Sequence, residues 1–402
     1  MNLNLYKLWL YAIVSLLYAL AVSCDNDEPA PQPDPPSGRT VLVYMVANNN
    51  LGSSGYDDAD IKEMLKAAEE GAIGADGRLL VYHAGFGTQP ELFEITQDGI
   101  VRHVLYDDAE YSVSQARMRE VIADTRRIAP AAEYGLVLWS HASGWLQDGI
   151  SEPERDIEET GISSYAFGQD RGHTMNITSL AEVLAGGDFD FIYFDCCYMA
   201  SVEVAYELRN ATHTIIGSST ELISDGMRYD LNIPMFFRAG SPDLIGAARN
   251  TFEYYDGMFG MMRTCTMSVI STAGLDRLAA ATRRIYSHAG IGLPEGYEPQ
   301  VFMEKSVASC YHFDFRDYVA ALALGAAGDS EQWPGAASDL ADFDDALADV
   351  VLYSASTPKL WNRILLDRVC GLSSYILMNN GSVGMKNYNT LGWYADVASA
   401  LN

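Results

Sequence analysis

Basic residues are scarce in this chain. It has 26 lysines and arginines against 54 aspartates and glutamates, which gives a net charge of −28. Proteins that bind nucleic acid need clustered lysine and arginine side chains to neutralise phosphates. The composition therefore argues against a nucleic-acid partner. It fits an exported protein that acidity keeps soluble, or a protein that acts on cationic substrates.

Motifs for several common kinds of site are also missing. No Cys-x-x-Cys pair occurs, and the adjacent Cys196 and Cys197 cannot easily both bind one tetrahedral zinc ion, so no structural zinc site is expected. There is no EF-hand loop and no Gly-x-Ser-x-Gly sequence to present a serine nucleophile. An odd number of cysteines follows residue 24, which raises the question of which thiol stays free.

The first 23 residues resemble a lipoprotein signal peptide. Lys7 precedes an apolar segment at 8–22, which is short for a membrane-spanning helix. Small residues then precede Cys24, so we expect Cys24 to carry lipid; an ordinary signal peptide cut nearby is the alternative. The proline-rich acidic stretch at 24–39 is a tether that cannot bury apolar surface. We predict an outer-membrane lipoprotein of the bacterial envelope, and acidic residues after Cys24 resemble export signals of surface lipoproteins.

From residue 40 onward, apolar runs typical of buried strands alternate with segments of helical periodicity. This order predicts βαβ units, and so an α/β fold with a mostly parallel sheet flanked by helices over 40–290. A less regular C-terminal subdomain, packed on this core, is expected at 291–402. Strands are expected at 40–46, 78–82, 134–140, 190–194, 212–217 and 266–271, with a hairpin over 91–105. Helices are expected at 57–70, 114–128, 180–185, 201–209, 243–259 and 274–287. The subdomain is expected to add helices at 313–324 and 343–353 and a strand at 372–377.

Two of the predicted strands end just before reactive side chains. His141 follows the strand at 134–140, and Cys197 follows the strand at 190–194. Parallel strands bring their carboxyl ends to one edge of a sheet, where a histidine can take the proton of a cysteine nucleophile. Taken alone, His141 would more often be a packing residue and Cys197 a small buried apolar residue. At matched strand ends, the pair indicates a cysteine hydrolase.

The residues around this pair resemble the clostripain family of cysteine peptidases, in the caspase-like clan. The matching motifs are His141-Ala142-Ser143-Gly144-Trp145 and Asp195-Cys196-Cys197-Tyr198-Met199, and the run from Val41 to Leu51 resembles the first strand and turn of the family. The resemblance implies an endopeptidase with Cys197 as nucleophile and His141 as the proton-transfer residue. Cys196, at the alanine position of the family, is a minor alternative. The backbone N–H groups of Ala142 and Cys197 would form the oxyanion hole, although the family usually has glycine at the position of Ala142. No third residue that orients His141 can be assigned.

The resemblance also implies what the enzyme acts on. Family members prefer arginine or lysine before the bond they cut, and Asp195 and Asp225 match the acidic residues of the specificity pocket. A strand-end cap and a turn residue are the simpler interpretations of these two aspartates. Many relatives activate themselves by cleavage between the histidine and the cysteine. Here this segment is the long polar loop at 146–176, with Arg155 and Arg171 as candidate cleavage sites.

Remaining expectations concern cofactors, partners and rival functions. Some relatives need calcium, so calcium is an expectation from the resemblance alone, and no other cofactor or metal is expected. We expect a monomer that acts on peptides or proteins and reaches the membrane through Cys24. One rival is a lapsed peptidase that binds basic peptides or glycans at the cell surface. Another is a transpeptidase on the same scaffold.

Overall fold

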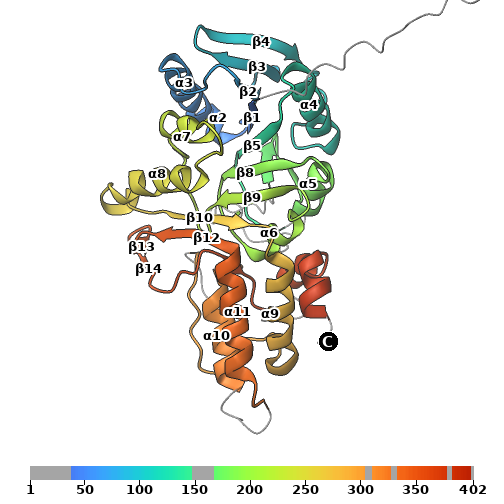
Figure 1. Cartoon of the computed structure of the whole chain (residues 1–402), viewed down its shortest axis with the longest axis vertical. Helices are drawn as coiled ribbons and strands as arrows, with labels where there is room; N and C mark the ends of the chain where they lie inside the picture. Colours follow the sequence, from blue (N-terminus) through green and yellow to red (C-terminus); the bar gives the residue numbers. More distant parts are fainter. Residues whose placement is uncertain (1–37, 147–166, 304–309, 327–332, 378–382, 400–402) are drawn as a thin grey trace, which may run out of the picture. The chain divides into compact units, whose positions relative to one another are not determined.

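A central sheet organises the protein (Figure 1). The computed structural model describes residues 38–146, 167–303, 310–326, 333–377 and 383–399. Within these residues nine strands form one sheet, in the order β12-β10-β9-β8-β5-β1-β2-β3-β4. The strands are β1 (Arg39–Val46), β2 (Gly77–Ala84), β3 (Glu91–Thr96), β4 (Gly99–Leu105), β5 (Glu133–Trp139), β8 (Phe189–Asp195), β9 (Thr212–Gly217), β10 (Thr266–Ser271) and β12 (Val351–Ser356).

The middle of the sheet is parallel, as the sequence predicts. β2, β1, β5, β8 and β9 all run in the same direction. Every residue of β1 is buried, which explains why this strand is a continuous apolar run and not an alternating one. The predicted α/β class is confirmed. Because these strands are parallel, their carboxyl ends lie at one edge of the sheet.

The two outer parts of the sheet are antiparallel. The predicted hairpin at 91–105 is confirmed as β3 and β4, on one side of the sheet. On the other side, β10 pairs antiparallel with β9, and β12 pairs antiparallel with β10. Ser268 near the start of β10 pairs with Gly217 at the end of β9. The chain that leads into β10 therefore lies at the same edge as the carboxyl ends of the parallel strands.

Helices cover both faces of the sheet, because alternate residues of each strand point to opposite sides. Leu42 and Tyr44 belong to one apolar core, and Val41 and Val43 belong to the other. The second core is covered by α3 (Tyr56–Glu69), α7 (Tyr229–Phe236) and α8 (Leu244–Asp256). The first core includes residues of α4 (Gln115–Ile128), α5 (Ile177–Leu184), α6 (Val202–Glu207), α9 (Leu275–Ala289), α10 (Phe315–Ala326) and α11 (Ala336–Val350). The last three helices also pack against one another (Figure 1).

The C-terminal part differs from the sequence prediction in two places. The helix expected at 343–353 is wrong at its end, because α11 stops at Val350 and the chain continues as β12. Val351-Leu352-Tyr353 suits a strand, since β-branched and aromatic residues favour the pleated conformation. The strand expected at 372–377 is reduced to β15 (Ser373–Ser374), which pairs with β11 (Phe313–Asp314). The C-terminal residues therefore complete the main sheet as well as covering it.

Several short elements complete the chain. The long loop expected at 146–176 ends in a hairpin of two strands, and its residues 147–166 lie outside the described part. The short elements are α2 (Asn50–Ser53), β6 (Phe167–Asp170), β7 (His173–Met175), η1 (Gly260–Met262), β13 (Lys359–Leu360), β14 (Ile364–Leu365), α12 (Val383–Tyr388) and η4 (Tyr394–Ala398). In the described part of the chain, no helix combines the length and the apolar character that crossing a membrane requires.

Candidate active site

The candidate site lies where β5 and β8 end side by side. Trp139, the last residue of β5, is the register partner of Asp195, the last residue of β8. His141 and Cys197 each follow that pair by two residues. The structure therefore places the predicted base and nucleophile at corresponding positions past neighbouring parallel strands, as the sequence analysis expected.

His141 is held by a residue that the sequence analysis did not identify. Its Nε2 lies 2.7 Å from Oδ1 of Asn50, the first residue of α2. An amide oxygen only accepts, so Nε2 carries the proton and Nδ1 is the accepting nitrogen of the neutral ring. Burial lowers the pKa of His141, which favours this neutral form. The asparagines after β1 were the available signal, because that strand ends at the same edge.

Cys197 is half-buried beneath the segment that follows β9. Its Sγ lies 3.4 Å from the backbone N of Leu222, whose N–H points to the sulfur, and 3.8 Å from the carbonyl oxygen of the same residue. Burial raises the pKa of Cys197 to about 12, and the bond from Leu222 only partly opposes this effect. Burial thus disfavours the thiolate, which is the form of cysteine that attacks.

Cys196 faces a different environment. Its side chain is 3% exposed, and its Sγ lies 3.7 Å from the carbonyl oxygen of Leu138 inside the core. Burial raises its pKa well above the ordinary thiol value. Cys196 is thus enclosed in the core just past the end of β8, whereas Cys197 remains partly exposed. This geometry favours Cys197 over Cys196 as the nucleophile.

Ala142, the predicted oxyanion-hole residue, fits its position without strain. The described non-glycine residues with positive φ are Arg171, Asp188, Tyr198, Trp361 and Asn362, and Ala142 is not among them. Its backbone forms an isolated bridge with Phe167 of β6. The glycine usual at this position of the family is therefore not needed here for its conformational freedom. The left-handed residue is instead Tyr198, at φ 62°, immediately after Cys197.

Asp195, at the end of β8, is buried and lies near a second buried carboxylate. Its Oδ1 accepts a hydrogen bond from Met227 N at 3.0 Å. Its Oδ2 is buried, and the hydroxyl of Tyr229 is near enough to lower the pKa of the carboxyl group without forming a well-aligned hydrogen bond. Asp60 of α3, which the sequence analysis missed, is also buried and accepts a hydrogen bond from Trp139 Nε1 at 2.7 Å. Within the described residues neither carboxylate forms an ion pair with a lysine or arginine.

The two carboxyl groups resist ionisation together. Burial raises the pKa of Asp195 to about 7, although the N–H of Met227 and the hydroxyl of Tyr229 oppose this effect. Burial, and then repulsion from Asp195, raises the pKa of Asp60 to about 9. Asp225, the other predicted pocket residue, is exposed in a turn and adds to the repulsion that raises the pKa of Asp60. The structure thus brings Asp195 and Asp225 into one acidic region and adds Asp60 to it.

The candidate cleavage sites differ in what the structure shows. Arg155 and the lipidation residue Cys24 lie outside the described residues. Arg171 lies in the turn between β6 and β7 with a left-handed backbone at φ 50°. Its guanidinium donates to the carbonyl of Asp108 at 2.9 Å and to the carboxylate of Asp170 at 3.1 Å. It also lies over the ring of Tyr111, 4.5 Å from its centroid.

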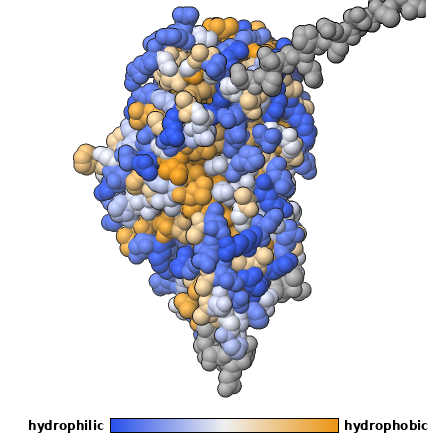
Figure 2. Space-filling model, viewed as in Figure 1, coloured by the Kyte–Doolittle hydropathy of each residue, from blue (hydrophilic) through white to orange (hydrophobic). Residues whose placement is uncertain are grey.

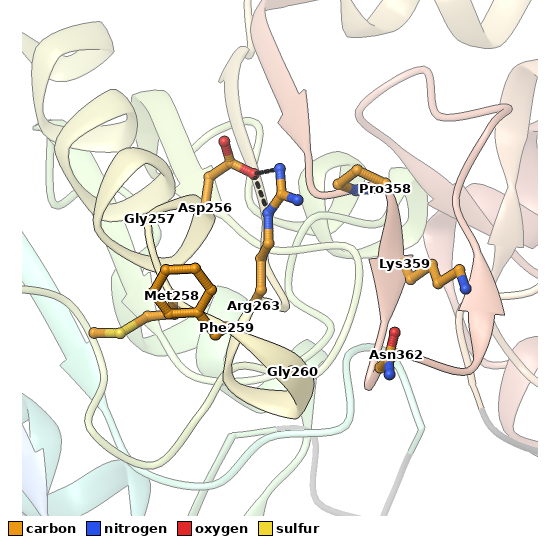
Figure 3. Close-up of a pocket in the computed structure, with 9 residues that line it drawn as sticks. All are labelled: Asp256, Gly257, Met258, Phe259, Gly260, Arg263, Pro358, Lys359 and Asn362. Atoms are coloured by element: carbon orange, nitrogen blue, oxygen red, sulfur yellow. Dashed lines mark hydrogen bonds and ion pairs between the residues drawn. The ribbon is translucent and has the colours of Figure 1, made fainter.

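A hollow with a volume of about 400 Å³ lies beside the same edge, between the α8–β10 connection and the start of β13 (Figure 3). Figure 3 shows Asp256 and Arg263, which form an ion pair, on one side of the hollow. Lys359 and Asn362 line the other side. Phe259 at its rim is 89% exposed. The surface view shows apolar side chains gathered in the middle of the face, beside α7 and α8 (Figure 2).

The fold and this site define a cysteine peptidase of caspase-like architecture, with an α/β sheet that carries a thiol and an imidazole on neighbouring strand ends. The model of the clostripain family matches residues 43–327, and the chain belongs to that family. No match was found among curated proteins.

Solved structures agree with this assignment. The chain is similar to an inactive zymogen C11 protease from Parabacteroides distasonis, with 28% identity, 90% of this chain and 98% of that chain covered, and a TM-score of 0.73. It is also similar to a secreted C11 cysteine protease from Bacteroides thetaiotaomicron in complex with an irreversible peptide inhibitor. That match has 29% identity, covers 90% of this chain and 99% of that chain, and has a TM-score of 0.69.

Calcium remains an expectation from the family resemblance. Within the described residues, no group of three or more His, Cys, Asp or Glu side chains is arranged to hold a metal ion. Calcium prefers several carboxylate and carbonyl oxygens around one point.

Proposed function

We propose that this peptidase cleaves peptide bonds after arginine or lysine, with Cys197 as nucleophile and His141 as acid and base. The observation that carries the specificity is the buried carboxylate of Asp195, two residues before the nucleophile, which has no lysine or arginine beside it among the described residues. A buried carboxylate without a cation is costly, and a substrate guanidinium or ammonium would supply the missing charge and the hydrogen bonds. The nearby carboxyl group of Asp60 would add to this attraction once it ionises.

The chemistry follows from the placement of the two side chains. His141 Nδ1 takes the proton of the Cys197 thiol, and the sulfur attacks the substrate carbonyl carbon to form a tetrahedral oxyanion. Backbone N–H groups of Ala142 and Cys197 would stabilise that oxyanion. The amine then leaves with the proton from His141. Water, deprotonated by the same ring, hydrolyses the thioester and restores the thiol. Asn50 holds the ring in the tautomer that these steps require.

A panel of fluorogenic peptides tests the specificity. The peptides are identical except for arginine, lysine, glutamine or glutamate before the scissile bond. We expect the arginine and lysine peptides to be cleaved with the highest kcat/KM and the glutamate peptide with the lowest, because the carboxylates attract a cation and repel an anion. Equal rates for arginine and glutamine would contradict the proposed specificity, while hydrolysis itself would still support the peptidase.

We also propose that the chain is made as a precursor and activated by a cut within 147–166. Burial raises the pKa of Cys197, whose sulfur contacts the backbone of Leu222. The similar protein from Parabacteroides distasonis is an inactive zymogen. Peptidases bind their substrates in extended conformation, whereas Arg171 is held in a tight turn by Asp108 and Asp170. Arg155 is therefore the better candidate of the two arginines.

Self-processing should accordingly depend on Arg155 and not on Arg171. We expect Arg155→Ala to block the cut in purified protein, and Arg171→Ala to leave the cut at the same position as in the wild type. Intact-mass analysis of incubated samples reads both results, and Cys197→Ala shows whether the cut is made by the protein itself. A cut directly after residue 171 would show that the β6–β7 turn opens and would overturn this choice.

The location is a separate proposal, carried by the sequence alone. We propose that residues 1–23 are removed and that Cys24 carries lipid, which would place the peptidase at the outer membrane with 24–39 as a tether. The similar protein from Bacteroides thetaiotaomicron is secreted, which is consistent with export. Labelling of cells with radioactive fatty acid, compared between the wild type and Cys24→Ser, tests the anchor.

A further inference from the structure

His312, in the C-terminal part of the chain, lies between the two catalytic segments. It is fully buried, just before β11. Its Nε2 lies 3.2 Å from the carbonyl oxygen of Ser143, two residues after His141. Its ring stacks on the ring of Tyr198, directly after Cys197, with 4.5 Å between centroids and 12° between planes. One side chain therefore contacts both segments that carry the proposed chemistry.

The contacts of His312 define its protonation. A carbonyl oxygen only accepts, so Nε2 donates to Ser143 and Nδ1 is an acceptor, 3.5 Å from the hydroxyl of Ser373. Burial lowers the pKa of His312 to about 3, so the ring is neutral over the physiological range. A buried ring with a fixed tautomer is suited to holding backbone in place and not to transferring protons.

The ring of His312 packs closely against the backbone of Gly144, with no space for a larger residue at that position. Gly144 has φ +72°, and a Cβ added to it would lie 2.7 Å from His312 Cε1 and 2.8 Å from the carbonyl oxygen of Tyr198. Only glycine allows the two segments and the histidine ring to approach this closely. Tyr198 has a left-handed backbone, which costs free energy for a bulky residue and persists only where surrounding contacts enforce it.

Neighbouring contacts attach the same region to the C-terminal part. Ser373 N donates to the carbonyl of Ala200 at 2.9 Å, close after Cys197. Trp145, close after His141, is fully buried and packs against the rings of Tyr375 and Tyr388. The C-terminal part therefore contacts each catalytic segment more than once, and His312 is the residue that bridges the two.

We propose that His312 is a positioning residue: its hydrogen bond to Ser143 and its stack on Tyr198 fix the segments of His141 and Cys197 relative to each other. This inference rests on the proposed roles of those two residues. It gives residues 291–402 a function in catalysis, because the hydrogen bond and the stack that set the geometry of the site come from that part of the chain.

The test separates the hydrogen bond from the stack. His312→Phe keeps a ring for Tyr198 but cannot donate to Ser143, whereas His312→Gln keeps an N–H donor of similar reach. The matched control is His288→Phe, because His288 is exposed on α9 and stacks on Trp333 at 4.9 Å, away from the catalytic segments. The full chain of each variant is assayed with an arginine peptide, and the rates are divided by the concentration of folded protein.

We expect His312→Phe to lower kcat by about tenfold to a hundredfold with little change in KM, because displacement of reacting groups by about 1 Å has effects of that size. His312→Gln should recover most of the loss, and His288→Phe should match the wild type. A wild-type kcat in His312→Phe, or a loss confined to KM, would overturn the inference. If His312→Phe does not fold, Tyr198→Leu, which removes the stack and leaves the hydrogen bond from His312 to Ser143, must lower kcat instead.

Failure of the proposed function would look different. In that case the wild type itself would cleave no peptide of the panel. The rate at which iodoacetamide alkylates Cys197 would then still compare the variants, since it needs only the thiol and its surroundings. Equal alkylation rates for the wild type and His312→Phe between pH 7 and 10 would overturn the positioning role independently of any substrate.

Discussion

Replacement of Cys197 by alanine is expected to abolish peptide hydrolysis. We expect kcat/KM for an arginine peptide to fall by about 10⁴-fold or more, because removal of the nucleophile of a covalent mechanism leaves only binding and oxyanion stabilisation. The structure supports this effect through the position of Cys197, which matches that of His141 across the register of β5 and β8. The measurement is a continuous fluorescence assay on activated enzyme at about pH 7.5, close to the range where a histidine base works.

Cys196→Ala is the matched control, because it removes a thiol group from the residue next to the proposed nucleophile. Cys196 is buried against Leu138, so its loss leaves only a small cavity and should cost about 1 kcal/mol of stability. We expect kcat/KM of this variant to stay within a few-fold of the wild type. If instead Cys196→Ala is inactive and Cys197→Ala is active, the assignment of the nucleophile is reversed and the peptidase chemistry remains.

Replacement of Asp195 by asparagine is expected to remove the preference for cationic residues. We expect kcat/KM for the arginine peptide to fall by about a hundredfold or more, since hydrogen bonds to a charged group contribute about 1.5–3 kcal/mol each. The glutamine peptide should be much less affected, because it brings no charge. Asp225→Asn is the control; its carboxylate is exposed and screened by water, so the loss should be smaller. Equal losses on both peptides would show that Asp195 supports the site without selecting the substrate.

The variant Asp195→Asn is also expected to change how the stability of the protein depends on pH. The folded protein raises the pKa of Asp195 from the ordinary 3.8 to about 7, so between these values it holds a proton that the unfolded chain has released. The free energy of unfolding therefore falls as pH rises from about 4 to 7, and the cost is complete above about 7. The asparagine side chain of the variant does not titrate, so the variant should lose less stability over that range. Urea unfolding at about pH 5 and about pH 8, on either side of the folded-state pKa, measures the difference. Parallel losses in both proteins would contradict it.

Agreement between sequence and structure is closest in the parallel part of the sheet. Strands such as β1 and β8 are buried on both faces, and a buried parallel strand must be apolar along its whole length. Agreement is poorest after residue 290. The boundary between α11 and β12 was missed because apolar residues continue across it, and a short apolar run fits both a helix and a strand.

The sequence predicted those residues of the candidate site that lie at strand ends, but not those that reach the site from other parts of the fold. Asp195 is the last residue of β8, and His141 and Cys197 each lie two residues past a strand end, so their place at the edge follows from the local pattern. Asn50, Asp60 and His312 are different. Asn50 contacts a residue 91 positions away and His312 a residue 169 positions away. Asn50 follows a strand that ends at the same edge, which was a usable signal, but the residues around Asp60 and His312 do not indicate which distant segment they meet.

By itself, the sequence determined the fold class, the edge of the sheet that carries the chemistry, and the two side chains proposed to perform it. The fold class and the edge follow from periodicity and strand order, which depend on near neighbours along the chain, and the choice of Cys197 over Cys196 follows from the resemblance to the clostripain family. Only the tertiary structure decided that burial raises the pKa of the Cys197 thiol, that Asp195 shares its burial with Asp60, and that His312 contacts both catalytic segments. Solvent exclusion and close packing set these properties, and both arise only when distant segments come together.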